Sequence, residues 1–375
     1  MKYKVLSCCI ALVLICTGSA FAQWNLEYGE ELGIDFMAVH FPSSTVGYAV
    51  ASGGIIYKTV DGGSTWNEQT SPTTTSFFDV FCKSETEVWA VGDNGLMVYT
   101  TDGTNWVVHD SSQVMTSQDI NAVFCLGNDI WLGCDASTFF YSNDNGANWS
   151  VPVTNPATDD VTDISFFDGN KGYASVDGAG IMYTNDGGAN WTMAALSLGP
   201  VSYSRTDIEC IIAVNSTVGV ASGWGSPTGI QPTIILVTTD GGLNWNNPDP
   251  TFPWNTHAYG WDVTMFDDGE VVIGGGISAS AAPVIHADDP WTTFSSSPAF
   301  FGADINGIAA VPGTDRIVAV GDEGLLALST DRGQNWEFLY DPGPGFAGLY
   351  KFCHIGKDIV MAVGTNGMLF KGDLT

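Results

Sequence analysis

Residues 59–66 read Thr-Val-Asp-Gly-Gly-Ser-Thr-Trp, and this arrangement of a hydroxyl residue, an aspartate, a glycine and a tryptophan recurs along the chain. A short side-chain oxygen can bond nearby backbone amides, glycine allows a positive φ, and tryptophan buries a large flat surface. The phrase therefore predicts a repeated structural turn rather than a catalytic site. The other copies contain Asp102 (in a copy one residue shorter), Asp144, Asp186, Asp240 and Asp331, and an eroded copy has Asp288, Pro290 and Trp291, with His286 in place of the hydroxyl residue.

Successive copies lie about 42 residues apart, a period that is typical of repeat architectures. Two intervals are longer, 54 residues from Asp186 to Asp240 and 48 residues from Asp240 to Asp288. Between the copies, short apolar runs alternate with glycine-rich turns and show no helical period. The sequence therefore predicts an all-β fold.

The number of repeat units follows from the first apolar run of each unit. Eight such runs are predicted as strands: 36–41, 77–82, 120–125, 161–166, 208–214, 261–266, 305–311 and 349–353. Only seven copies of the phrase follow these eight runs. The N-terminal residues 23–26 (Gln-Trp-Asn-Leu) resemble the residues around and after the tryptophan of a copy, such as residues 335–338 (Asn-Trp-Glu-Phe). We therefore expect one closed ring of eight four-stranded units, in which the chain stops within its eighth copy and the N-terminal strand completes the last unit. A ring of seven units with one irregular unit is the alternative.

The first 22 residues are predicted to be a secretory signal. Lys2 and Lys4 precede an apolar run, and Ala20-Phe21-Ala22 offers small residues before a cleavage site at Gln23. We expect residues 23–375 to form one exported, monomeric domain without a membrane span. The formal net charge of −30 disfavours nucleic acid and anionic lipid as partners, and five scattered cysteines after residue 22 provide no disulfide framework.

The repeated phrase resembles the Asp-box, or BNR repeat, of β-propellers. Residues 47–50 (Gly-Tyr-Ala-Val) and 91–95 (Val-Gly-Asp-Asn-Gly), with similar phrases at 320–324 and 363–367, also resemble the photosystem II stability and assembly factor family of propellers. The resemblance covers nearly all of the chain after residue 22. It implies a role in protein assembly, with an arginine-lined patch that meets a membrane-protein client.

The expected function is that of an exported, non-enzymatic binding module, an assembly or adhesion factor whose partner is a protein or a neutral glycan. The alternative is a carbohydrate-active enzyme, either a glycoside hydrolase or an enzyme of the sialidase kind. A sialidase implies three arginines converging on a carboxylate, and this chain has only Arg205, Arg316 and Arg332. A glycoside hydrolase requires two carboxylates about 5 to 9.5 Å apart. The histidines have no metal-ligand spacing, and we expect no cofactor.

Long loops on a rigid scaffold are where binding sites concentrate. The two stretched intervals enlarge three neighbouring loops, over residues 196–206, 223–232 and 246–260. Clustered aromatic residues with one arginine are typical binding anchors, although the same residues could merely pack the loops down. The predicted recognition patch consists of Tyr203, Arg205, Trp224, Phe252, Trp254, His257, Tyr259 and Trp261.

A second candidate site is periodic. An aspartate stands at or just before the start of several first strands, so these carboxylates are expected to gather at the mouth of the channel. They could hold a hard cation such as Ca²⁺, or each could cap its own turn through nearby backbone amides. The five residues are Asp35, Asp119, Asp160, Asp207 and Asp304.

Overall fold

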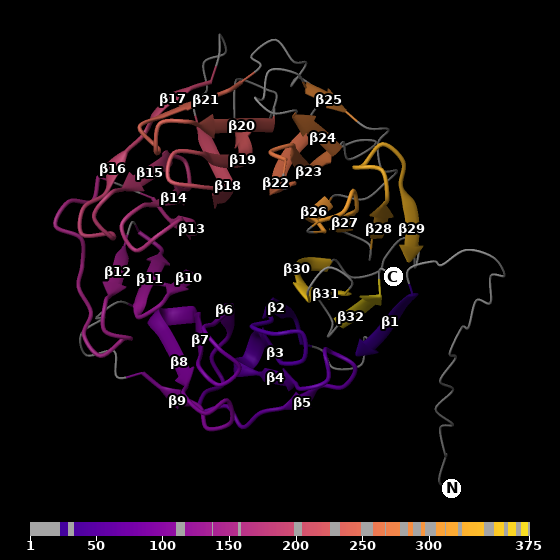
Figure 1. Cartoon of the computed structure of the whole chain (residues 1–375). Helices are drawn as coiled ribbons and strands as arrows, with labels where there is room; N and C mark the ends of the chain where they lie inside the picture. Colours follow the sequence, from indigo (N-terminus) through magenta and orange to yellow (C-terminus); the bar gives the residue numbers. More distant parts are fainter. Residues whose placement is uncertain are drawn as a thin grey trace, which may run out of the picture.

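The apolar runs between the boxes form short antiparallel strands that pair into eight sheets around a central opening (Figure 1). This computed structural model describes residues 23–28, 34–109, 117–136, 138–156, 159–198, 205–225, 233–248, 258–266, 268–277, 284–287, 294–296, 305–311, 313–321, 325–340, 349–355, 359–364 and 369–373. The predicted signal segment, residues 1–22, lies outside them. The eight sheets agree with the eight first strands counted in the sequence.

The first four sheets, or blades, follow the chain in order, each with its first strand nearest the channel. Blade 1 is β2 (Phe36–His40), β3 (Gly47–Ala51), β4 (Ile56–Thr59) and β5 (Asn67–Glu68); blade 2 is β6 (Phe77–Cys82), β7 (Val88–Gly92), β8 (Leu96–Thr100) and β9 (Val107–Val108). Blade 3 is β10 (Ile120–Leu126), β11 (Asp129–Cys134) and β12 (Phe139–Ser142); blade 4 is β13 (Val161–Phe166), β14 (Gly172–Val176), β15 (Gly180–Thr184) and β16 (Thr192–Met193). Single 3-10 turns, Ser52–Gly54 and Asp93–Gly95, join the second and third strands of blades 1 and 2.

The other four blades close the ring. Blade 5 is β18 (Thr206–Ala213), β19 (Gly219–Gly225), β20 (Thr233–Thr238), β21 (Asn244–Asn246) and β17 (Ala195–Ser197); blade 6 is β22 (Ala258–Met265), β23 (Val271–Ile277), β24 (Val284–Ala287) and β25 (Phe294–Ser296). Blade 7 is β26 (Ile305–Ala310), β27 (Ile317–Gly321), β28 (Leu326–Ser329) and β29 (Glu337–Tyr340); blade 8 is β30 (Leu349–Ile355), β31 (Ile359–Gly364), β32 (Leu369–Asp373) and β1 (Gln23–Tyr28).

Two blades depart from the expected four strands. In blade 3 the fourth strand is reduced to a single bridge between Tyr141 and Ser150. In blade 5 the linker from blade 4 adds β17, which pairs in parallel with β21. Part of the segment predicted as the first enlarged loop is therefore a strand, because the linker follows the edge of the next sheet.

The ring closes as the sequence predicts. Strand β1 pairs antiparallel with β32, from Gln23 opposite Asp373 to Tyr28 opposite Leu369. The first described strand of the chain thus becomes the outer strand of the last blade (Figure 1). This pairing covers the outer edge of β32 and fixes the N-terminal strand to the last blade.

The hydrophobic core lies between the blades. Among the residues that the structure describes, the buried side chains fall into eight clusters, each shared by two neighbouring blades. In the cluster between blades 8 and 1, Met361 and Leu369 pack with Phe36 and Trp66. The box tryptophans fill these interfaces; Trp191, for example, is 1% exposed.

The box is a self-contained turn. In the first copy, the Thr59 hydroxyl donates to Asp61 Oδ1 (2.8 Å) and accepts from the Gly63 amide (2.9 Å), while Asp61 Oδ1 also accepts from the Thr65 amide (2.8 Å). Gly63 has a φ of +83°, which favours glycine. These contacts give the repeated phrase a structural role.

The turns divide between two faces of the ring. The Gly62 amide donates to Thr45 O, which ties the first box to the turn between β2 and β3. On the opposite face, the Asp93 amide donates to Ser76 O, which ties the turn between β7 and β8 to the residue before β6. We call these the box face and the loop face.

Candidate functional site

Blades 5 and 6 have hairpins that extend further toward the loop face than those of the other blades. In six blades the first strand begins at a buried apolar residue, such as Phe77 or Ile305. In blades 5 and 6 the first strand begins two residues earlier, at Thr206 and Ala258, and it pairs along its full length with the second strand. These neighbouring extensions, which we call the platform, lie at the site where the sequence predicts recognition.

Arg205 lies at the loop-face end of this platform, directly before β18. Its Nε donates to both carboxylate oxygens of Asp207 (2.7 and 2.8 Å), and its Nη2 donates to Asp177 Oδ2 (2.7 Å). The Asp207 side chain is almost fully buried, whereas the Arg205 side chain is 51% exposed. Hydrogen bonds from Arg205 to Asp207 and Asp177 raise the pKa of the guanidinium, which stays charged. The two carboxylates therefore hold a cation in a fixed orientation at the surface.

Trp224 lies beside this cluster, in β19 rather than in the predicted loop. The ladder of blade 5 continues past the expected end of the strand and places Trp224 opposite Asp207. The indole Nε1 donates to Glu209 Oε1 at 3.0 Å. Asp207 is thus the residue next to both, since it binds Arg205 and lies opposite Trp224 in the ladder.

The rest of the predicted patch is only partly placed. Trp261 belongs to β22, as predicted, and so does Tyr259, because the ladder of blade 6 begins before the predicted start of the strand. Four of the predicted residues lie outside the described part of the chain: Tyr203, Phe252, Trp254 and His257.

The carboxylates at the channel mouth bind the neighbouring blade. Asp119 Oδ1 accepts from the Asn94 amide, Asp160 Oδ1 from the Ala136 amide, and Asp207 Oδ1 from the Gly178 amide, at 2.7–2.8 Å. Each donor lies in the turn between the second and third strands of the preceding blade. For these residues, the interpretation that each caps its own turn was therefore wrong, because the acceptor crosses to another blade.

The remaining two members of the predicted ring are Asp35 and Asp304. Asp35 accepts from the Ser52 amide through its backbone carbonyl, and its own amide donates to the Ser52 hydroxyl. Asp304 lies outside the described residues. Within the described ranges, no group of three or more histidine, cysteine or acidic residues could hold a metal ion. Likewise, no described helix is long and apolar enough to cross a membrane.

The inner wall of the channel contains acceptors that the sequence interpretation missed. Ser165 Oγ accepts from the Ala213 amide (3.0 Å), and Thr264 Oγ1 accepts from the Ala310 amide (2.9 Å), in each case across a blade boundary. In blade 1, His40 occupies the strand position that corresponds to Ser165 and Thr264. Its Nδ1 accepts from the Cys82 amide of blade 2 at 3.4 Å. Burial lowers the pKa of His40 to about 4, so at neutral pH this ring is uncharged and can accept.

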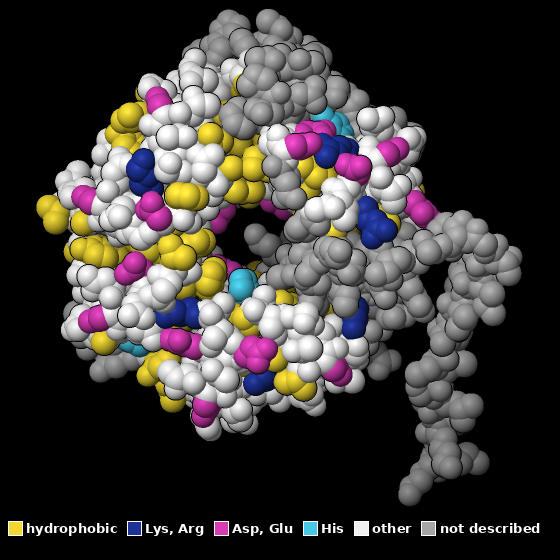
Figure 2. Space-filling view, viewed as in Figure 1, with side chains coloured by type: hydrophobic (Ala, Val, Ile, Leu, Met, Phe, Trp, Pro, Cys, Tyr) yellow, Lys and Arg dark blue, Asp and Glu magenta, His cyan; other side chains and the backbone are white. Residues whose placement is uncertain are grey.

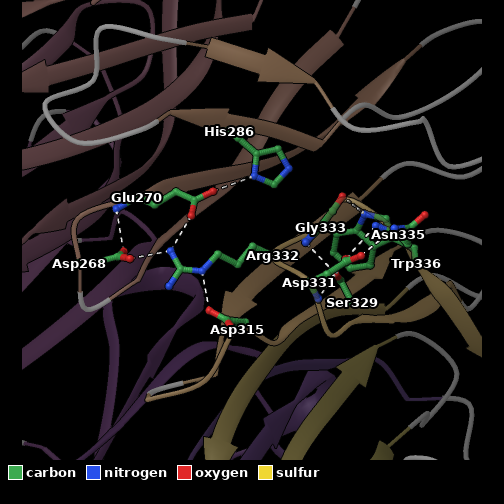
Figure 3. Close-up of polar contacts among 10 residues, drawn as sticks. All are labelled: Asp268, Glu270, His286, Asp315, Ser329, Asp331, Arg332, Gly333, Asn335 and Trp336. Atoms are coloured by element: carbon green, nitrogen blue, oxygen red, sulfur yellow. Dashed lines mark hydrogen bonds and ion pairs between the residues drawn. The ribbon is translucent and has the colours of Figure 1, made fainter.

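Arg332, on the box face, is bound by three carboxylates (Figure 3). Its Nε donates to Asp315 at 2.6 Å, and its Nη1 donates to Asp268 and Glu270 at 2.7 Å. Glu270 also contacts His286 Nδ1 (3.2 Å), the residue that replaces the hydroxyl of the eroded box. These ion pairs join blades 6 and 7 where the box pattern is incomplete.

The arginines of this propeller do not converge on one point. Arg205 lies on the loop face of blade 5, and Arg332 lies on the box face of blade 7 with its guanidinium engaged by carboxylates. The three-arginine arrangement implied by the sialidase alternative is therefore not formed. The box face in Figure 2 instead shows acidic and basic side chains scattered around a central opening.

The family model described as Photosynthesis system II assembly factor YCF48 matches residues 19–157, which span the first three blades. The chain is an Asp-box β-propeller that resembles this assembly factor. A search of curated proteins gave no match.

Solved structures share the architecture of the propeller. YCF48 bound to D1 peptide aligns with a TM-score of 0.55 at 16% identity, over 96% of this chain and 98% of that chain. YCF48 from Cyanidioschyzon merolae aligns with a TM-score of 0.57 at 18% identity, over 93% and 98%. The computationally designed Ika8 protein aligns with a TM-score of 0.68 at 14% identity, also over 93% and 98%. At these sequence identities, the structural similarity shows a shared fold.

Proposed function

We propose that this propeller is an exported, non-enzymatic binding module that captures a segment of a partner protein on the loop face of blades 5 and 6. The observation that carries the proposal is the pair of extended hairpins, with a half-exposed Arg205 fixed between two carboxylates and Trp224 beside it. A scaffold that places a tryptophan beside an oriented arginine matches the composition of binding hot spots.

The likeness to YCF48 supports a polypeptide as the ligand, since one of the similar structures is YCF48 bound to D1 peptide. The formal net charge of −30 favours a client segment that is basic or neutral, because the chain would attract basic rather than acidic segments. We therefore expect an assembly or adhesion factor whose partner presents a basic or neutral segment. A neutral glycan is the second ligand class, because sugar rings also stack on aromatic side chains.

Replacing Trp254 and Tyr259 together with alanine tests the patch. We expect the double variant to lose at least about tenfold in partner capture, since two anchors of an interface are removed. The melting temperature should change little. Capture is measured by pull-down from envelope extracts of the source organism followed by titration of the recovered protein, with a neutral oligosaccharide as a competitor.

The matched control is Phe338→Ala, which removes an exposed aromatic residue from the outer strand of blade 7 and should leave capture unchanged. A double variant that melts far lower but still captures the partner would show that these aromatic residues only pack the loops.

A further inference from the structure

The two faces of the ring differ in their positive charges. Apart from Arg205, every lysine and arginine whose side chain the structure describes lies on the box face (Figure 2). Lys58, for example, donates to Gly103 O in the next box at 2.8 Å, and Lys371 donates to Ser64 Oγ in the first box at 2.6 Å. On the described part of the loop face, Arg205 is therefore the only cation. The box-face residues are Lys58, Lys83, Lys171, Arg316, Arg332 and Lys371.

The turns between the second and third strands repeat one arrangement in blades 2, 3 and 4. Each begins with an aspartate (Asp93, Asp135 or Asp177), which is followed by a residue with a positive φ. The amide of this second residue donates to the aspartate that stands before the first strand of the next blade. Two aspartates therefore belong to each of three successive seams between blades: Asp93 with Asp119, Asp135 with Asp160, and Asp177 with Asp207.

The third of these pairs shows which ligand the arrangement can hold. Arg205 donates through Nε to Asp207 and through Nη2 to Asp177 Oδ2, so one planar guanidinium bridges both carboxylates. In the sequence, Arg205 stands two residues before Asp207. The residue two before Asp160 is Thr158, which has no charge. The seam between blades 4 and 5 thus contains its own cation, and the seam between blades 3 and 4 has none at the corresponding position.

Asp135 and Asp160 each have one oxygen engaged. Asp160 Oδ1 accepts from the Ala136 amide at 2.8 Å, and Asp135 Oδ1 accepts from Asn121 Nδ2 at 2.9 Å. Among the described residues, no donor reaches Oδ2 of either side chain. Burial raises the pKa of Asp135, the hydrogen bond from Asn121 lowers it, and the negative charges of Asp160 and Asp119 raise it further. These carboxylates thus lie near one another, and no described cation compensates them.

We propose that the seam between blades 3 and 4 is a guanidinium-binding site, in which an arginine of another polypeptide bridges Asp135 and Asp160. This arginine takes the place that Arg205 has in the next seam. The nitrogens of a guanidinium fork can reach two separate carboxylates at once, whereas the ammonium group of lysine is a compact point charge. The excess of negative charge on the loop face attracts such a ligand. The seam is separate from the platform of blades 5 and 6, so this site does not depend on the proposed function.

The probe is the peptide Gly-Gly-Arg-Gly-Gly with an acetylated N-terminus and an amidated C-terminus, which carries only the guanidinium charge. It is titrated into the full chain at pH 7 and low ionic strength, and the backbone amide resonances of Ala136 and Gly178 are followed by NMR. We expect a saturable shift of the Ala136 resonance. The Gly178 resonance should stay unchanged, because Arg205 already fills its seam. The lysine peptide should bind several-fold more weakly, and the uncharged citrulline peptide should not bind.

Substitutions in both seams test the assignment. Asp135→Asn and Asp160→Asn keep an acceptor oxygen for Asn121 and for the Ala136 amide but remove one charge, so each should bind the arginine peptide about tenfold more weakly. Arg205→Ala vacates the next seam, and the Gly178 resonance should then respond to the peptide as the Ala136 resonance does.

The matched control is Asp129→Asn, which makes the same charge change at the start of β11, on the box face of blade 3, and should keep the full response. The proposal is overturned by an Ala136 resonance that does not respond, by unchanged affinity in both asparagine variants, or by equal binding of the lysine or citrulline peptide. A Gly178 resonance that stays silent in a folded Arg205→Ala chain would also contradict it. The double variant at Trp254 and Tyr259 should bind the peptide normally, so the two proposals fail independently.

Discussion

A chain that lacks residues 23–28 is expected to melt roughly 10 °C below a chain that begins at Gln23. The deletion removes β1, whose pairing with β32 extends from Gln23 to Tyr28, and leaves the last blade with an open edge. Loss of about five inter-strand hydrogen bonds, each contributing about 1 kcal/mol, amounts to on the order of 5 kcal/mol.

The measurement is thermal unfolding of both chains, with hydrogen exchange at the amides of β32 as a local readout. Exchange in β32 should accelerate in the shortened chain, while exchange in β7 of blade 2 should change far less. Equal melting temperatures and equal protection of β32 would contradict closure of the ring by the N-terminal strand.

Asp163→Ala should lower the free energy of unfolding by about 2–5 kcal/mol, a large loss for a single substitution. The carboxylate accepts from the Ile164 amide and from the Ile211 amide of the next blade. Removing it leaves two main-chain donors without their partner. Asp163→Asn keeps one acceptor oxygen and should lose about half as much.

Chemical denaturation of both variants measures this loss. The control is Glu68→Ala, which removes an exposed carboxylate from the outer strand β5 and should change the free energy of unfolding by less than about 0.5 kcal/mol. A loss from Asp163→Ala as small as that of the control would show that the carboxylate does not join blades 4 and 5.

The features that could be predicted from the sequence are those whose contacts join residues close together in the chain. Each box is complete within eight residues, so Thr59, Asp61, Gly63 and Trp66 identify their turn without knowledge of the rest of the chain. Ring closure was also predictable, because the residues after a box repeat at the N-terminus. The blade count followed from the eight first apolar runs.

The features that sequence reasoning missed depend on a second blade. The partners of Asp119 and Asp160 lie 25 and 24 residues away, and those of Asp79 and Asp163 lie 44 and 48 residues away. Because these partners belong to other blades, the sequence alone pointed only to local capping or cation binding.

The extent of the loops at blades 5 and 6 was misjudged for a related reason. Trp224 and Tyr259 stand in stretches with the glycines and prolines of a loop, but ladder pairing continues through them. Cross-strand pairing overrides local propensity when the partner strand is long enough. The result is a firmer platform than a pair of long loops would provide.

The central claim is that the partner contacts the loop face of blades 5 and 6, and site-specific photo-crosslinking tests it most directly. A crosslinking residue is placed at Tyr259 or, on the box face of blade 5, at the exposed Leu243. If the partner binds the loop face, it should be crosslinked from position 259 and not from position 243. Crosslinks from position 243 with none from position 259 would contradict the claim.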